Sequence, residues 1–196
     1  MKTQNQLSLF SPSVNTEEKK EIIILLSPPD EVKADLRRLK YEAARYAGNF
    51  EGMHSEAYIS LFKFNTNNFE SFKKYIPFLE NHLLQFDKGI KVKISGIHFH
   101  HHFNNKNTIQ AKIKEVNDVS ALQQSILRFY NQQNFGFQPK IALATTYFES
   151  QFKRIWQILE AKNYRKTFTC NQLVILERNF GSNKKFNLLA EIQLSS

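Results

Sequence analysis

The segments AYISLF (residues 57–62) and PKIALA (residues 139–144) decide the fold, because each is a short apolar run of strand length. Each run is followed within a few residues by apolar side chains at helical spacing, over residues 69–83 and 150–162. A chain that builds the same strand–helix unit twice can set its two strands side by side. We therefore expect a cleft lined by side chains from both strands.

Four side chains of these two strands are candidates to meet a ligand. Side chains alternate between the faces of a strand, so Tyr58 and Ser60 share one face of the first strand. Lys140 and Ala142 share one face of the second strand for the same reason. The chemistry of these four residues decides what the cleft can do.

The remaining patterns add further strands and helices. Residues 22–26 form a continuous, mostly β-branched apolar run that predicts a central strand, and Asp30 is a good N-cap for the helix that follows. Alternating or helical patterns predict strands at residues 90–103, 109–113, 166–170, 172–178 and 186–194, and a helix at residues 119–130. The total is about eight strands and four helices, which is typical of an α+β protein.

Composition limits the partners and the compartment. The chain of 196 residues carries a formal net charge of +9, which favours an acidic partner such as RNA or a nucleotide; a basic surface that only keeps the protein soluble is the alternative. The single cysteine, Cys170, excludes an internal disulfide and fits a reducing cytoplasm. We expect a flexible arm at residues 1–18, a single bilobal domain at residues 19–196, no signal peptide and no membrane span.

The order of these patterns is similar to that of a known family. The strand at residues 22–26, the stretch Pro28-Pro29-x-Glu31-Val32 and its helix resemble the start of 2'-5' RNA ligase-like proteins, members of the two-histidine (2H) phosphoesterase superfamily. The resemblance continues through residues 57–84 and 139–162 and covers nearly the whole chain after residue 20. It implies a bilobal α+β fold, with two mainly antiparallel sheets around a central cleft and helices outside.

The resemblance also implies a site, and this chain departs from it. Family members carry His-x-Thr or His-x-Ser on each motif strand, and act without metal or cofactor on 2'-5' linkages, 2',3'-cyclic phosphates and related phosphodiesters. One histidine removes a proton, the other supplies one, and the hydroxyl groups hold phosphate oxygens. Here the motifs read Tyr58-Ile59-Ser60 and Lys140-Ile141-Ala142, so only Ser60 keeps its family role.

The two replacements change the chemistry that is possible. An imidazole accepts and donates protons near pH 7, whereas a phenol or an ammonium group, with a reference pKa of about 10, stays protonated there. We therefore expect Tyr58, Ser60 and Lys140 to bind the phosphate of RNA or of a nucleotide, and the two-histidine reaction to be lost.

Other histidines leave two alternatives open. His54, in the loop before Tyr58, and His98, His100 and His102, on one face of a predicted strand, can be recruited to an active phosphodiesterase. The last three suit zinc by residue type, but no carboxylate or cysteine accompanies them locally, so we expect no metal.

A basic surface with adjacent aromatic residues Phe99 and Phe103 is expected at lysines 91, 93, 106, 112 and 114. It is either an RNA-binding surface or a soluble sheet edge. Besides the active phosphodiesterase, the second alternative to a phosphate-binding function is a protein interaction module with an empty cleft.

Overall fold

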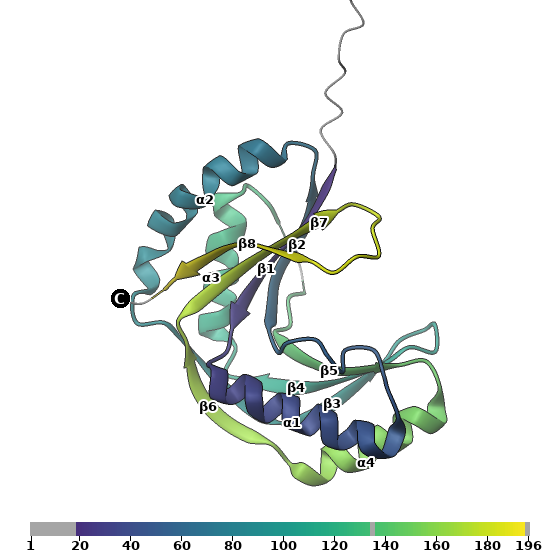
Figure 1. The fold of residues 1–196 in the computed structure, drawn as a ribbon. Helices are drawn as coiled ribbons and strands as arrows, with labels where there is room; N and C mark the ends of the chain where they lie inside the picture. Colours follow the sequence, from purple (N-terminus) through teal and green to yellow (C-terminus); the bar gives the residue numbers. More distant parts are fainter. Residues whose placement is uncertain (1–18, 134–135, 195–196) are drawn as a thin grey trace, which may run out of the picture.

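A computed structural model describes residues 19–133 and 136–194 as a strongly curved sheet with helices on its outer face (Figure 1). The strands are β1 Lys20–Ser27, β2 Ile59–Thr66, β3 Ile90–His101, β4 Asn107–Lys114, β5 Lys140–Thr146, β6 Arg165–Cys170, β7 Gln172–Asn179 and β8 Asn187–Gln193. The helices are α1 Asp30–Ala47, α2 Phe69–Leu83, the short 3₁₀ helix η1 Leu84–Phe86, α3 Asn117–Phe129 and α4 Glu149–Lys162. The arm expected at residues 1–18 lies outside the described residues.

The eight described strands form one antiparallel sheet in the order β6-β3-β4-β5-β2-β1-β7-β8. Its two halves meet where β2 pairs with β5 through one residue pair, Ile59 with Ile141. The bilobal α+β fold is thereby confirmed, with one difference from the sequence-based expectation. The two expected sheets are continuous, because the motif strands touch before they diverge.

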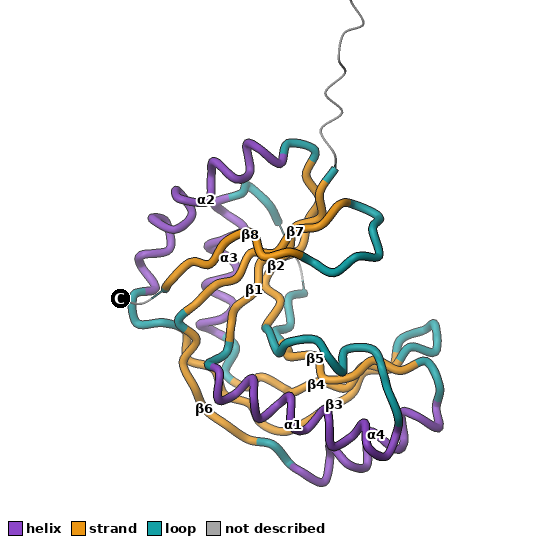
Figure 2. The backbone as a smooth tube through the Cα atoms, viewed as in Figure 1, coloured by secondary structure: helices purple, strands orange, loops and turns teal. Residues whose placement is uncertain are grey.

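The helices cover the outer face of both halves (Figures 1 and 2). The first helix, α1, follows β1 but packs beside α4 on the half made by β3, β4 and β5, while α2 and α3 pack on the other half. On β1, Ile22, Ile24 and Leu26 are fully buried against these helices, so the continuous apolar run does form a central strand. None of the helices in the described part of the chain combines the length and apolar character needed to cross a bilayer.

Two local predictions need correction. Asp30 is the first residue of α1 rather than its N-cap; Pro29 takes that position, and no side chain there bonds to the helix. Tyr58 lies just before β2, which begins at Ile59. The placement of Cys170 in the core is confirmed: its side chain is fully buried, and burial raises the pKa of its thiol to about 12.

A buried lysine holds the loop that leads into β2. Lys40, on α1, is 1% exposed, and its Nζ donates hydrogen bonds to the carbonyl oxygens of Gly52 at 2.9 Å and Ser55 at 2.8 Å. Burial lowers the pKa of Lys40 to about 8, and the charge of Arg37 acts in the same direction. Lys40 thus ties two points of the loop that leads to Tyr58 to α1, beside other contacts such as the bridge between Glu51 and Thr145.

We expect Lys40→Met to lower the free energy of unfolding by about 1–3 kcal/mol at neutral pH, because two loop carbonyls lose their donor. Denaturant unfolding at constant pH measures the change. The matched control is Lys74→Met at an exposed position on α2, which should change the value by less than about 0.5 kcal/mol. Equal stability of the two variants would mean that Lys40 does not hold the loop.

The cost of burying this charge predicts a pH dependence. Between the folded pKa of about 8 and the reference value of 10.5, the folded state loses the Lys40 proton while the unfolded state keeps it. The unfolded state then binds more protons, so the contribution of Lys40 to stability rises with pH. The destabilisation by Lys40→Met should therefore grow by about 2 kcal/mol between about pH 7 and about pH 9.5. A difference between wild type and variant that stays constant with pH contradicts this assignment.

Candidate functional site

The contact between the two motif strands fixes which side chains face the cleft. Ile59 and Ile141 pair directly, and both side chains are fully buried on the helix-covered face. Their neighbours Ser60, Lys140 and Ala142 are exposed on the opposite, concave face, as strand alternation requires. The structure thus brings the exposed positions of both motifs to the same junction.

The Tyr58 side chain contacts Glu56, in the loop before β2, and Lys33, on α1. Its hydroxyl donates a hydrogen bond of 2.9 Å to the Glu56 carboxylate, and Lys33 Nζ lies 5.1 Å from the centre of its ring. Burial raises the pKa of Tyr58 to about 12, and the hydrogen bond to Glu56 and its charge add to the shift. The phenol is therefore protonated at neutral pH, and its proton already has an acceptor.

Lys140 lies in a different environment, formed by β3, β4 and β5. It pairs with Lys112 across the β4–β5 ladder, and in the next pairs of the sheet Gln110 lies between Ala142 and His98. These side chains line a pocket of about 460 Å³, which we call the lysine pocket. It is lined by His98, Phe99, His100, Gln110, Lys112, Ile113, Val116, Phe137, Gln138, Pro139 and Lys140. Lys140 therefore joins two of the candidate histidines, while Tyr58 and Ser60 are not among its lining residues.

Charge is unevenly distributed over the concave face. On the half that contains β1, the Glu21 carboxylate lies between Lys63 and Arg178, and these neighbours lower its pKa. On the other half, no acidic group of residues 19–133 and 136–194 forms an ion pair with Lys112 or Lys140. Two uncompensated ammonium groups facing one pocket make it attractive to anions.

Gln110 supplies the pocket with an unused acceptor. Its Oε1 atom is buried and has no hydrogen-bond partner among the described residues. Buried polar atoms are almost always paired, so an unpaired one beside a pocket is suited to a donor from a ligand. The sequence contains a signal for this residue, because alternation along residues 107–114 places Thr108, Gln110 and Lys112 on one face.

The candidate histidines separate into three environments. His98 and His100 line the lysine pocket, and the His100 ring lies 4.5 Å from that of His102, edge to face. His102 Nε2 lies 3.1 Å from Thr108 Oγ1; partial burial lowers the pKa of His102, and the charges of His100, Lys106 and Lys140 add to this. His54 instead lies in the loop beside Tyr41 of α1, with ring centres 6.1 Å apart. Only the histidines of β3 lie next to Lys140.

The structure places part of the expected basic and aromatic surface. The Phe99 ring lies 4.7 Å from Trp156 and 5.3 Å from Phe152, yet Phe99 stays 41% exposed and also lines the lysine pocket. Lys93 forms an ion pair of 3.0 Å with Glu115. Within the described residues, no group of three or more metal-ligating side chains is arranged to hold an ion.

Solved structures of known proteins share this arrangement of strands and helices. No protein-family model and no curated protein matches the sequence. The structure is similar to Escherichia coli LigT complexed with 3'-AMP, with a TM-score of 0.56 and 10% identity over 90% of this chain and 99% of that one. It is also similar to Kluyveromyces marxianus Usb1 with uridine monophosphate, with a TM-score of 0.51 and 12% identity over 87% and 97% of the two chains. This chain has the 2'-5' RNA ligase-like fold.

The likeness of fold bears mainly on the junction of β2 and β5. The family resemblance noted in the sequence is confirmed for the fold, and it places the two motifs on strands that meet at the centre of the sheet. At these positions the 2'-5' RNA ligase-like fold of this chain presents Tyr58, Ser60, Lys140 and Ala142. Sequence identities near 10% carry no residue roles from LigT or Usb1 to this chain.

Proposed function

We propose that this protein binds a phosphate group of RNA or of a nucleotide in its central cleft, with Lys140 as the main contact, and that two-histidine catalysis is absent. The observation that carries the proposal is the pair Lys112 and Lys140, which face one pocket without an acidic partner among the described residues. Ammonium groups donate strong, charge-assisted hydrogen bonds to phosphate oxygens.

The other lining groups favour a nucleotide over a bare anion. His98 and His100 can donate to further phosphate oxygens, but the buried Gln110 Oε1 can only accept. A ribose hydroxyl or a base amino group would satisfy it, whereas a fully ionised phosphate would not. Ser60, exposed at the junction on the side of β2, is placed to supply a hydroxyl from the other half.

The same groups are unsuited to a two-histidine proton relay. A general base must be deprotonated near the working pH and within reach of the proton it removes. The Tyr58 phenol has a pKa of about 12 and donates its proton to Glu56, so it is neither a base nor a free donor at neutral pH. Ala142 carries no hydroxyl to hold a phosphate oxygen.

Ligands of proteins with this fold support the proposal. LigT structures are described as complexed with 3'-AMP, with NADP+ and with ATP, and the Usb1 structure holds uridine monophosphate. Each of these ligands combines a phosphate group with a ribose. The lysine pocket presents groups that complement both parts.

One observation favours an active phosphodiesterase as a second candidate. His102 has a lowered pKa and lies against His100, which itself lines the lysine pocket. Two neighbouring imidazoles can serve as a proton acceptor and a proton donor. In this reading His100 of β3 and His102, just after it, would replace the missing motif histidines.

We expect Lys140→Ala to weaken RNA binding at low salt and to lower the slope of log affinity against log salt concentration by about 0.7, the contribution of one phosphate contact on a single strand. Fluorescence anisotropy with a labelled RNA at several salt concentrations measures both quantities. Lys74→Ala, at the exposed position on α2, is the matched control. Equal affinity and slope for the two variants would remove Lys140 from the binding site.

We expect no turnover of 2',3'-cyclic nucleotides or of 2'-5' linked oligonucleotides by the wild-type protein, since neither motif supplies a titrating imidazole. Chromatography of the products measures this, and a parallel preparation of His100→Ala shows whether any activity belongs to a contaminating nuclease. Turnover that His100→Ala abolishes establishes the second candidate and contradicts the loss of catalysis. Absence of both binding and turnover would instead favour a protein interaction module.

A further inference from the structure

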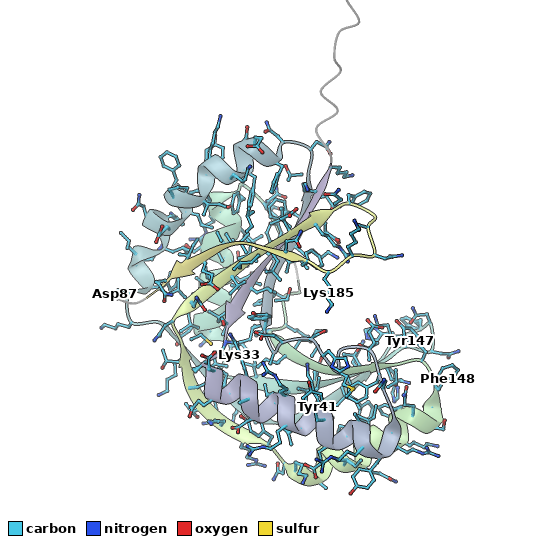
Figure 3. The ribbon with its side chains drawn as sticks, viewed as in Figure 1. Lys33, Tyr41, Asp87, Tyr147, Phe148 and Lys185 are labelled. Atoms are coloured by element: carbon cyan, nitrogen blue, oxygen red, sulfur yellow. The ribbon has the colours of Figure 1, made fainter. Side chains whose placement is uncertain are left out.

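A cluster of exposed aromatic side chains lies at the free end of the half that carries the lysine pocket. Phe103 at the β3–β4 turn is fully exposed, Phe148 is 72% exposed, and Tyr147 is 50% exposed. Figure 3 shows Tyr147 and Phe148 together at this end, beyond β5. With Lys106 they form what we call the aromatic lip. Single exposed aromatics are ordinary, but three at one end of the sheet, with Lys106 among them, indicate an interaction surface.

The aromatic lip is held rigidly at its centre. The Tyr147 hydroxyl donates a hydrogen bond of 2.8 Å to Glu51, and Lys106 Nζ lies 6.0 Å from the centre of the Tyr147 ring. The hairpin turn is closed by a hydrogen bond of 2.8 Å from the His102 amide to the Lys106 carbonyl. Aromatic rings that are fixed before binding lose little entropy when a second ring stacks on them.

A hollow lies beside the aromatic lip, and the ring contact between His102 and His100 links its lining to that of the lysine pocket. It measures about 550 Å³ and is lined by His101, His102, Asn105, Asn107, Tyr147, Phe148, Glu149 and Ser150. His102 stacks edge to face on His100, which lines the lysine pocket. From His98 to His102 the strand advances about 13 Å, so one small ligand in the lysine pocket does not fill the hollow as well.

We infer that the aromatic lip stacks unpaired bases of a single-stranded RNA whose phosphate lies in the lysine pocket. The inference rests on the proposed function and names its substrate class: an extended single strand rather than a mononucleotide. Every base offers a flat face, so stacking on Phe148 tolerates any sequence, while Lys106 and the lysine pocket attract the backbone. A paired duplex keeps its bases stacked inside and cannot offer them to the lip.

The test compares an oligonucleotide with a mononucleotide on the same variants. We expect Phe148→Ala to weaken binding of a labelled uridine oligonucleotide of about eight residues by about tenfold, since base–aromatic stacking contributes roughly that factor or more. Binding of uridine 3'-monophosphate, followed by NMR titration, should not change. Phe78→Ala, which removes a similarly exposed ring on α2, is the control for folding and for nonspecific loss.

Salt dependence separates the parts of the surface. Phe148→Ala should leave the slope of log affinity against log salt unchanged, whereas Lys106→Ala should lower it by about 0.7. A Phe148→Ala variant that binds the oligonucleotide as wild type does, or loses both ligands equally, overturns the aromatic lip as a stacking site. So does a duplex that binds as tightly as the single strand. If wild type binds neither ligand, the proposed function itself fails.

Discussion

The pairing of Ile59 with Ile141 is the constraint on which the site depends. These two buried side chains are the one register point between the halves of the described sheet. Because side chains alternate along a strand, a slip of one residue would turn Lys140 and Ser60 into the core and bring buried isoleucines into the cleft. Burial of two apolar side chains therefore determines which polar groups reach a ligand.

At that junction the chain keeps the geometry of a two-sided site but changes its chemistry. Tyr58 is turned toward its own loop, where Glu56 accepts its proton and Lys33 lies over its ring. Lys140 is turned toward β4 and β3, where Lys112, His98 and His100 surround the same space. Tyr58 and Lys140 would have to exchange protons across a substrate in a two-histidine type of reaction, but the two side chains contact different neighbours. Under the proposed function, such an arrangement would hold an anion without transforming it.

The sequence predicted the strands and helices well, because their signals are local. The apolar run at residues 22–26 and the helical spacing of apolar side chains at residues 69–83 both depend on neighbours in the chain. The composition of the lysine pocket was not predictable in the same way. It depends on β5 pairing with β4, which sets Lys140 against Lys112 across about thirty residues of chain, and no local pattern encodes such pairing.

The asymmetry of charge explains why a phosphate should settle on one half of the cleft. On β1, β2 and β7 the Glu21 carboxylate lies within ion-pair distance of Lys63 and Arg178, so those two cations are largely neutralised. Around β4 and β5 the ammonium groups have no such partner among the described residues. An anion entering the cleft is therefore drawn toward β5, away from Tyr58. In a two-histidine site both halves must reach the same phosphate. In this chain Lys112, Lys140, His98 and His100 lie on one half, and the two histidines extend that group along β3, so a ligand held there can lie along the sheet.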